Sequence, residues 1–320
     1  MTTRPALPPV VDSILDLVGN TPMVRLTRIT LPDEAEVYAK LEYLNPGGSV
    51  KDRIGVGMIE RAERAGLLQK GGTIIEPTAG NTGIALALAG VRLGYKVILC
   101  VPENFSMEKQ EVMKALGGRV ELTPKDDGMK GAIARAQELA RDIPSSYIPQ
   151  QFVNAFNTES HEETTGPEIF AQMGGRVDAF VAGAGTGGTF TGVTKYLRAR
   201  LPDVYCVIVE PQGSILKGGE AGPHDVEGIG ASSFIPPVLE MDLADEIITV
   251  DDEPAFAMVR RLAGLEGILG GGSGGANVEA AVRVARKLGA GKRVVTLIPD
   301  AAERDMSKGI FSKWAKPLAE

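Results

Sequence analysis

Short runs of β-branched and aliphatic residues alternate with longer amphipathic stretches along almost the whole chain. The apolar runs predict strands at about 37–41, 73–75, 96–101, 119–122, 179–182, 205–209, 246–250 and 293–298. The amphipathic stretches predict helices at about 51–68, 82–93, 107–116, 129–143, 161–173, 191–201, 254–265 and 276–288. Elements that alternate in this way form right-handed crossovers and mostly parallel sheets, so the pattern predicts an α/β fold.

The charge balance and the apolar runs exclude two classes of partner. A net charge of −7, without a dense run of Lys or Arg, argues against nucleic-acid binding. The best candidate for a membrane span, 84–101, is interrupted by Arg92 and Lys96. Residues 1–9 lack an apolar signal segment, so we expect no membrane association and a cytoplasmic location.

Residues that commonly hold metals or attack substrates are scarce. Cys100 and Cys206 each lie inside a predicted buried strand, which supports neither a disulfide framework nor a cysteine-rich metal site. His161 and His224 lack metal-ligand spacing, so we expect both to be structural and expect no metal. We do not expect a Ser-His-Asp hydrolase either.

Glycine is unusually frequent and unevenly distributed. The chain has 40 glycines in 320 residues, whereas about 7% is usual. Of these, 17 fall within the segments 183–192, 213–230 and 267–275. Such clusters let backbone N–H groups approach a ligand closely, most often a phosphate or a carboxylate.

The segment Gly183 to Thr189 (G-A-G-T-G-G-T) follows a predicted strand and opens a helix. Its amides would lie at the positive end of the helix dipole, which predicts a phosphate site. The segment also satisfies G-x-G-x-x-G, and Glu210 ends the next strand where a ribose-binding acid would stand, so a dinucleotide site is a serious alternative. Two threonine hydroxyls in the turn suit a phosphate monoester better, and a turn without ligand is the third possibility.

A second strand end leads into a helix at Glu76 to Gly83 (E-P-T-A-G-N-T-G). Thr78, Asn81 and Thr82 offer side-chain hydrogen bonds there, and the exposed amides favour an anion such as a carboxylate. The alternative is that these side chains only cap the helix.

A lysine stands at the start of a predicted helix in the segment 45–53 (N-P-G-G-S-V-K-D-R). Ser49 and Asp52 fit a capping pattern, which places Lys51 in the first turn. The positive end of the dipole disfavours the ammonium form, so we expect a lowered pKa and the free amine that Schiff-base chemistry needs. Most first-turn lysines are nevertheless solvated surface groups.

A third glycine-rich approach to a helix spans 269–276 (L-G-G-G-S-G-G-A). Ser273 is the one side chain in this run that can form hydrogen bonds. We expect it to act as an N-cap, which does not exclude contact with a ligand.

Taken together, the three motifs N-P-G-G-S-V-K-D-R, P-T-A-G-N-T-G and G-A-G-T-G-G-T resemble those of fold-type II pyridoxal-phosphate (PLP) enzymes, in particular the cysteine synthase and cystathionine β-synthase family. The resemblance runs from about Asp12 to Ser312. It implies a tryptophan synthase β-like fold, with two three-layer α/β/α subdomains and mostly parallel sheets, as one catalytic unit over 1–320. The smaller subdomain would span about 43–152, and the larger, phosphate-binding one about 11–42 plus 153–320.

The resemblance also implies PLP as the cofactor and a role for each matching residue. Lys51 would hold the cofactor and act in catalysis, Asn81 would lie against the ring hydroxyl, and Ser273 would face the pyridine nitrogen. The phosphate would be cradled by Gly185, Thr186, Gly187, Gly188 and Thr189. The substrate carboxylate would be bound with the help of Thr78, Gly80, Thr82 and Gln151, and Gly228 would line the entrance of the site.

The implied activity is replacement of the β-substituent of O-acetyl-L-serine or L-serine by a thiol, with Lys51 moving the Cα proton. Sulfide would give L-cysteine, and homocysteine would give L-cystathionine. Ala79 stands where many members carry serine, so one hydroxyl contact to the substrate is missing. Segments such as 209–216 and 300–308 look more like the cystathionine-forming branch, whose bacterial members can use O-acetylserine with homocysteine.

Other functions remain open from the sequence. They are serine or threonine dehydratase-type β-elimination, a nicotinamide-dependent oxidoreductase, and a cofactor-binding protein without catalytic activity. An oxidoreductase function would not explain the presence of Lys51 and Ser273. As partners, the resemblance implies small amino-acid and thiol substrates, a second copy of the chain in a homodimer, and a serine acetyltransferase as a candidate protein partner.

Overall fold

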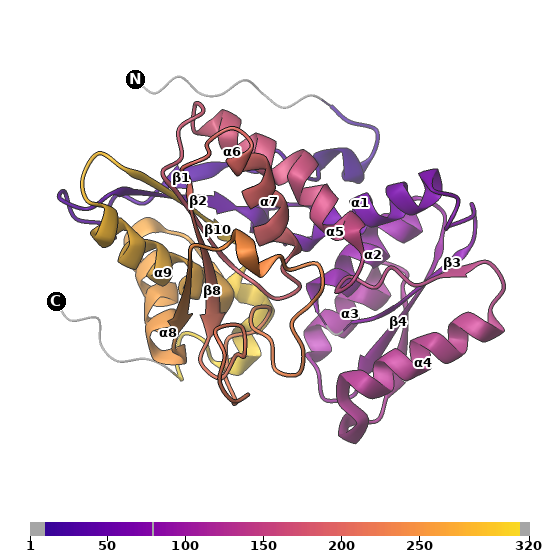
Figure 1. Ribbon diagram of the computed structural model, residues 1–320. Helices are drawn as coiled ribbons and strands as arrows, with labels where there is room; N and C mark the ends of the chain where they lie inside the picture. The colour runs from indigo at the N-terminus through magenta and orange to yellow at the C-terminus, as the bar shows by residue number, and fades with distance from the viewer. Residues whose placement is uncertain (1–9, 79, 314–320) are drawn as a thin grey trace.

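Two β-sheets with helices packed on both faces of each make up the molecule (Figure 1). The structure is a computed structural model that describes residues 10–78 and 80–313, without the side chains of residues 307 and 308. Ala79 lies outside the described residues, and so does the expectation that concerns its missing hydroxyl. Within the described part, no helix combines the length and the apolar character that a membrane crossing requires.

The larger sheet has the strand order β1-β2-β10-β7-β8-β9. Its strands are β1 (Met23–Arg25), β2 (Glu36–Leu41), β10 (Arg293–Ile298), β7 (Ala179–Gly183), β8 (Tyr205–Pro211) and β9 (Glu246–Val250). β1 runs antiparallel to β2, and the other neighbouring pairs are parallel.

The smaller sheet is parallel throughout its described strands, in the order β5-β4-β3-β6. Its strands are β5 (Arg119–Thr123), β4 (Lys96–Pro102), β3 (Thr73–Pro77) and β6 (Ser146–Tyr147). The predicted α/β fold with mostly parallel sheets is confirmed, because parallel strands covered on both faces are typical of that class.

Helices cover both faces of each sheet, so each half of the molecule has three layers (Figure 1). On the smaller sheet, α1 and α2 share a core with one face and α4 with the other. On the larger sheet, α8 and α9 cover one face, and α6 and α7 cover the other. The helices are α1 (Lys51–Arg64), α2 (Asn81–Arg92), α3 (Met107–Ala115), α4 (Gly128–Asp142), α5 (Ala155–Ser160), α6 (Gly166–Gln172), α7 (Gly188–Arg198), α8 (Asp252–Arg261) and α9 (Gly272–Leu288).

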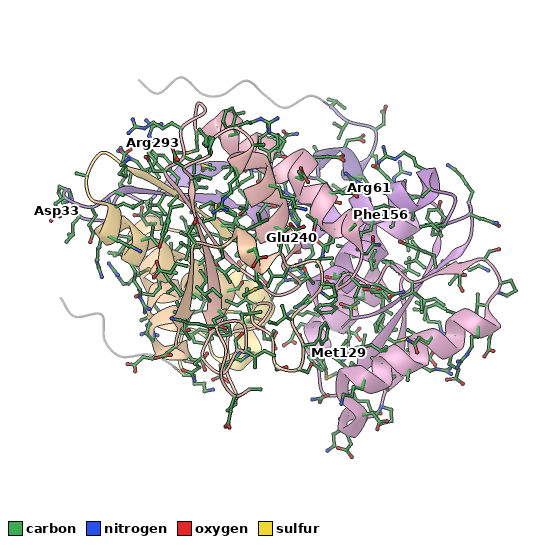
Figure 2. The ribbon with its side chains drawn as sticks, in the orientation of Figure 1. Asp33, Arg61, Met129, Phe156, Glu240 and Arg293 are labelled. Atoms are coloured by element: carbon green, nitrogen blue, oxygen red, sulfur yellow. The ribbon has the colours of Figure 1, made fainter. Side chains whose placement is uncertain are left out.

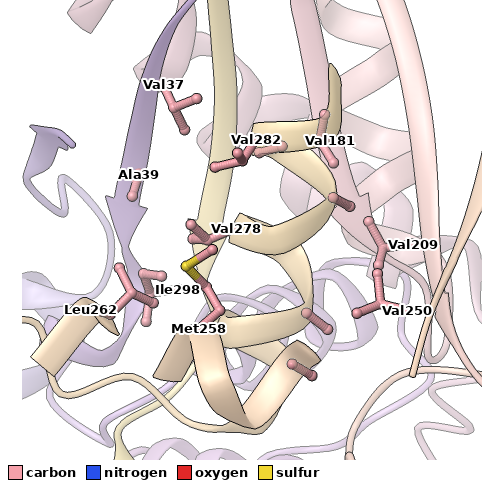
Figure 3. Close-up of a cluster of buried hydrophobic side chains, with 14 of the residues drawn as sticks. Val37, Ala39, Val181, Val209, Val250, Met258, Leu262, Val278, Val282 and Ile298 are labelled. Atoms are coloured by element: carbon pink, nitrogen blue, oxygen red, sulfur yellow. The ribbon is translucent and has the colours of Figure 1, made fainter. Parts of the chain in front are cut away.

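Small and β-branched side chains form the core between α9 and the larger sheet (Figure 3). Val278 and Val282 of α9 face Val37 and Val181 of the strands, and Met258 of α8 lies beside them. All five are at most 1% exposed, so removing methyl groups here would leave a cavity and cost several kcal/mol. This packing holds the first turn of α9 close to the ends of β7 and β10.

The glycine-rich helices begin earlier than the sequence predicts. α7 begins at Gly188 instead of 191, and α9 begins at Gly272 instead of 276. Glycine has a low helix propensity, which is why the sequence places these residues in the preceding loops. Packing overrides that propensity: a Cβ at Gly275 would come within 2.2 Å of the carbonyl oxygen of Ala255 in α8. The glycines therefore let two helices approach closely.

Other boundaries differ for local reasons. The predicted helix 51–68 ends at Arg64, because Gly66 adopts a positive φ of 72°. The predicted helix 161–173 is preceded by α5 and enters α6 through a π-helical turn, His161–Thr165. The short strands β1 and β6 were not predicted, since two or three residues carry too little periodicity.

The predicted subdomain limits stay a prediction, with which the positions of the two sheets are compatible. The smaller sheet lies within residues 73–147, and the strands of the larger sheet lie outside this range. α5 follows the expected boundary yet packs on the smaller half, where Phe156 contacts its core and Arg61 of α1 reaches Ser160 (Figure 2). α5 therefore contributes to the junction between the two halves.

Candidate active site

One pocket forms where strands of both sheets end at their carboxyl termini. β3 is followed by Asn81, β7 by Gly185 and β10 by Asp300, and the loop after β2 leads to Lys51. Ligands of α/β proteins bind at this edge of a sheet. The predicted site residues that line the pocket are Lys51, Asn81, Gly185, Thr186, Gly187, Thr189, Gly228 and Ser273.

Lys51 is the first residue of α1 and faces the pocket. Protein atoms surround its amine, and this burial lowers the pKa of Lys51 to about 8, against a weaker opposing effect of Asp300. The expected direction of the shift is confirmed, but burial is its main cause, whereas the sequence argument named the helix dipole. At neutral pH, the fraction of molecules with a neutral amine is therefore larger for Lys51 than for an ordinary lysine.

The expected capping pair before Lys51 does not form. The N-cap residue of α1 is Val50, and Ser49 Oγ accepts a hydrogen bond from the Lys51 amide at 3.3 Å. The Asp52 carboxylate accepts from the Gly47 amide instead, at 2.5 Å. The prediction of a capping box was wrong because the turn at Gly47 and Gly48 folds back onto Asp52.

The segment Gly185 to Thr189 forms a cradle of backbone amides at the start of α7. A side chain larger than glycine does not fit at position 185, where a Cβ would lie 2.2 Å from the carbonyl oxygen of Gly228. Gly187 has a φ of 90°, which L residues rarely adopt. The turn therefore exposes backbone N–H groups, and their partial positive charge suits an anion.

Two buried side chains that the sequence analysis did not assign to the site support this cradle. Asn157 Nδ2 donates to Thr186 Oγ1 at 3.0 Å and to the carbonyl oxygen of Gln151 at 2.8 Å. Its amide also lies against Gly188, where a Cβ would come within 2.0 Å of Asn157 Oδ1. His161 is 3.1 Å from Thr189 Oγ1, so a histidine predicted to be structural supports a residue of the cradle. No short motif marks either residue, because both act through distant contacts.

The residues expected to bind a carboxylate lie beside the pocket but do not belong to its lining. Thr78 is buried, and Gly80 is the N-cap residue of α2. Thr82 Oγ1 donates to Gln151 Oε1 at 2.7 Å, so these two side chains satisfy each other. Gly188 also lies outside the lining, at the first position of α7.

A buried carboxylate that the sequence analysis did not single out holds the segment with Gln151. Glu76 accepts hydrogen bonds from the amides of Gln150 and Gln151 at 2.9 and 3.1 Å. Burial raises the pKa of Glu76 to about 7, although these two hydrogen bonds lower it. Glu76 at the end of β3 thus fixes the backbone that carries Gln151.

Ser273 lies at the far side of the pocket, inside the first turn of α9. The N-cap residue is Gly271, so the expectation that Ser273 caps the helix was wrong. Asn277, one turn further on, donates to the carbonyl oxygen of Leu297 and accepts from the Gly183 amide at 2.8 Å. These two bonds tie α9 to β10 and β7 at the pocket.

The geometry argues against a dinucleotide site. Glu210, the acid that would bind a ribose, is 2% exposed and accepts from the Leu216 amide and from Thr249 Oγ1 at 3.1 and 3.0 Å. Both carboxylate oxygens therefore hold neighbouring protein segments. In the described part of the chain, no group of three or more His, Cys, Asp or Glu residues could hold a metal ion.

Comparisons with known proteins identify the family of this chain. The model of the pyridoxal-phosphate dependent enzyme family matches residues 14–300. An O-acetylserine dependent cystathionine β-synthase of Bacillus subtilis is 49% identical over 302 residues, which cover 94% of this chain and 98% of the relative. A cysteine synthase of Staphylococcus aureus is 48% identical over 304 residues, which cover 94% and 97%.

A solved structure extends the similarity to three dimensions. The crystal structure of O-acetylserine dependent cystathionine β-synthase from Helicobacter pylori has a TM-score of 0.90 and 47% identity, and the match covers 94% of this chain and 99% of that one. Similarity of this extent in sequence and structure is decisive. The chain belongs to the family of pyridoxal-phosphate dependent enzymes, with the fold-type II architecture.

Proposed function

We propose that the protein catalyses PLP-dependent replacement of the acetoxy group of O-acetyl-L-serine by a thiol. The observation that carries the proposal is that Lys51, which is half-buried, lines one pocket together with an anion cradle at the start of α7. Burial of its amine lowers the pKa of Lys51 to about 8. Relatives with 48–49% identity are named for cystathionine and cysteine synthesis, which supports β-replacement over dehydratase or nicotinamide chemistry. Homocysteine and sulfide are the two thiols to compare.

The donor set of the pocket fits PLP. The bare amides of Gly185 and Gly187 and the hydroxyls of Thr186 and Thr189 match the oxygens of a phosphate monoester. The Lys51 amine suits the aldehyde, and the Asn81 amide and the Ser273 hydroxyl suit the ring oxygen and ring nitrogen. A Cβ at Gly185 would displace the backbone at Gly228, so the cradle depends on the missing side chain.

PLP, when bound, supplies an electron sink for the charge that develops at Cα of an amino acid. Lys51 would hold the cofactor and, once the amino acid takes its place, would accept the Cα proton. The Cβ–O bond would break with acetate keeping the electron pair, the thiolate would form the Cβ–S bond, and Lys51 would return the proton to Cα. The lowered pKa of Lys51 suits both transfers near neutral pH.

Thr78, Gly80, Thr82 and Gln151 are proposed to bind the substrate carboxylate. Thr82 and Gln151 form a hydrogen bond with each other, so they must exchange it for contacts with the substrate. The backbone clamp from Glu76 keeps Gln151 in place during this exchange. Gly228, whose carbonyl oxygen lies against Gly185, lines the entrance.

The experiment that tests the proposal compares sulfide and homocysteine, each with O-acetylserine and with serine, at equal enzyme concentration. We expect the visible absorption band of bound PLP to change on addition of O-acetylserine, and cysteine or cystathionine to accumulate. The thiol with the higher kcat/KM identifies the physiological product. A protein that binds no PLP, or forms neither product, contradicts the proposal.

The attachment of PLP to the apoenzyme is expected to become faster as the pH rises, with a midpoint near 8. Below this pH most of the Lys51 amines are protonated and cannot attack the aldehyde, because burial lowers the pKa of Lys51 only to about 8. At pH 7.5 about a quarter of the molecules would carry the free amine, against about 0.1% for an unperturbed lysine. Stopped-flow absorbance between pH 6 and 10 measures the midpoint; a value above 10 would show that burial does not act on this amine.

Replacing Ser273 with aspartate is expected to increase side products several-fold relative to the β-replacement product. Ser273 is neutral and does not hold a proton on the ring nitrogen, whereas a carboxylate at the positive end of α9 stays ionised and does. Product ratios by chromatography measure the effect. Ser273→Ala is the matched neutral control and should keep the wild-type ratio; an unchanged ratio in Ser273→Asp contradicts the argument.

The family resemblance supports a homodimer in the cytoplasm, and it makes a serine acetyltransferase a candidate partner. Light scattering of the purified chain, alone and with a serine acetyltransferase, measures both associations. A monomer at micromolar concentration would exclude the dimer.

A further inference from the structure

The segment that follows β10 crosses from the larger sheet to the smaller half and contacts two of its motifs. The carbonyl oxygen of Pro299 accepts from the Val50 amide at 2.8 Å, and Asp300 forms an antiparallel bridge with Ser49. The Arg304 guanidinium donates to the carbonyl oxygen of Gly47. The segment therefore lies directly beside the loop that leads to Lys51.

The same segment binds both ends of the Asn81 amide. Asn81 Nδ2 donates to Asp300 Oδ2 at 2.7 Å, and Arg304 Nη1 donates to Asn81 Oδ1 at 3.0 Å. An ionised carboxylate can only accept and a guanidinium can only donate. The orientation of the amide is thus determined by two charged groups, and a flipped amide would place donor against donor and acceptor against acceptor.

Asp300 is built into the wall of the pocket. It is 8% exposed, and its second oxygen, Oδ1, has no hydrogen-bond partner among the described residues. Oδ1 lies against Gly271, where a Cβ would come within 2.4 Å, at the start of α9. The positive end of that helix favours a carboxylate. Burial raises the pKa of Asp300 only to about 6, so it is ionised at neutral pH.

A buried carboxylate with an unpartnered oxygen destabilises a fold. The hydrogen bond to Asn81 gives the Asp300 carboxylate a function. With one hydrogen of Nδ2 engaged by Asp300, the other hydrogen remains available in the pocket, where Asn81 is proposed to meet the ring oxygen of PLP. A donor, not an acceptor, is what such an oxygen needs.

We infer that Asp300 and Arg304 are positioning residues that orient the Asn81 amide so that it offers an N–H to the cofactor. This inference rests on the proposed function, because it assumes that PLP occupies the pocket. It adds two residues that orient Asn81; Asp300 also raises the pKa of Lys51 through its charge.

A double-mutant cycle on the holoenzyme tests the inference, with Asp300→Ala, Asn81→Ala and the double variant. The readouts are the position of the visible band of bound PLP and the dissociation constant of PLP measured by dialysis. Each single variant is expected to shift the band and to weaken PLP binding about tenfold, which is the effect of one charge-assisted hydrogen bond. Asp300 is inferred to act through Asn81. In the Asn81→Ala background, Asp300→Ala should therefore raise the dissociation constant of PLP by less than about twofold.

Two further variants keep the test independent of folding. Asp300→Asn retains an acceptor for Asn81 Nδ2 and should preserve the band of the wild type even if Asp300→Ala is unstable. Asp305→Asn is the matched control, because Asp305 is buried in the same segment but pairs with Lys109 at 3.2 Å. The charge of Asp305 raises the pKa of Asp300, so Asp305→Asn should shift the band far less than Asp300→Ala, which removes the hydrogen bond to Asn81 itself.

Additive effects in the cycle, or an unshifted band in Asp300→Ala, overturn the inference. So does a shift in the Asp305→Asn control of the same size as in Asp300→Ala. Wild-type protein without bound PLP would instead refute the proposed function, and the two failures are thus distinguishable.

Discussion

Replacing Lys51 with alanine is expected to lower the rate of β-replacement by about 10³-fold or more and to abolish covalent attachment of PLP. General acid–base catalysis alone contributes roughly 10²–10⁴-fold, and Lys51 is proposed to move the Cα proton twice in each turnover. Alanine is a good helix former at the start of α1, so the unfolding temperature should change little. Steady-state rates, and mass spectrometry after borohydride reduction, measure the two effects.

The control for this variant is Lys130→Ala, which removes an exposed lysine of α4. It should retain wild-type activity and the pyridoxyl-modified peptide at Lys51. The amide cradle at Gly185 to Thr189 remains intact in Lys51→Ala, so weak, non-covalent PLP binding should persist. Full activity of Lys51→Ala would refute the proposed mechanism.

Replacing Arg53 with methionine is expected to lower the free energy of unfolding by about 3–5 kcal/mol, the usual effect of breaking a buried ion pair. The Arg53 side chain is 1% exposed and forms two bonds each to Glu42, at 2.7 and 2.9 Å, and to Glu168, both at 2.7 Å. Lys40 binds Glu168 at 2.8 Å, so two cations balance two anions. Loss of Arg53 leaves an uncompensated negative charge between α1 and α6. Urea denaturation measures the change.

Two further variants identify the cause. Arg119→Met breaks an exposed pair with Glu121 and should cost less than about 1 kcal/mol. The double variant Arg53→Met with Glu42→Gln restores the charge balance and should recover part of the loss. If Arg53→Met is as stable as Arg119→Met, the buried network contributes nothing to stability.

The same network predicts a loss of stability in acid. Burial raises the pKa of Glu168, but the hydrogen bonds and positive charges of Arg53 and Lys40 together outweigh it and lower the pKa from 4.5 to about 2. A carboxyl whose folded pKa is depressed stabilises the protein above its unfolded pKa. This contribution should therefore decline between about pH 4.5 and 2, and Arg53→Met should show a weaker decline over this range.

Several parts of the site could be predicted from local sequence because their chemistry is local. Gly185 and Gly187 form a turn that follows a strand and precedes a helix, and both the strand and the helix have clear periodicity. Lys51 begins a long amphipathic helix, so its position at a helix start follows from the neighbouring residues. The pocket brings both together, as expected from strands that end at the same edge.

Other features depended on contacts between residues that are far apart in the sequence. Ser273 was expected to cap α9 but lies within its first turn, since Gly275 lets α9 approach α8 closely and the helix begins earlier. Asn157 and His161 support the amide cradle across 28–29 residues of sequence, and Asp300 binds Asn81 across 219. Hydrogen bonds over such separations follow from tertiary packing, and the bond between Asn81 and Asp300 joins the two halves.

The sequence by itself determined the alternation of strands and helices and the parallel sheets. It also determined which chemical groups follow the carboxyl ends of the strands. Periodicity and glycine placement act within one or two turns, so they can be recognised without a fold. Only the tertiary structure decided the protonation of Lys51, the orientation of Asn81 and the starts of the glycine-rich helices. These depend on burial and on partners from distant segments, because desolvation and charge pairing exist only after the two halves have packed together.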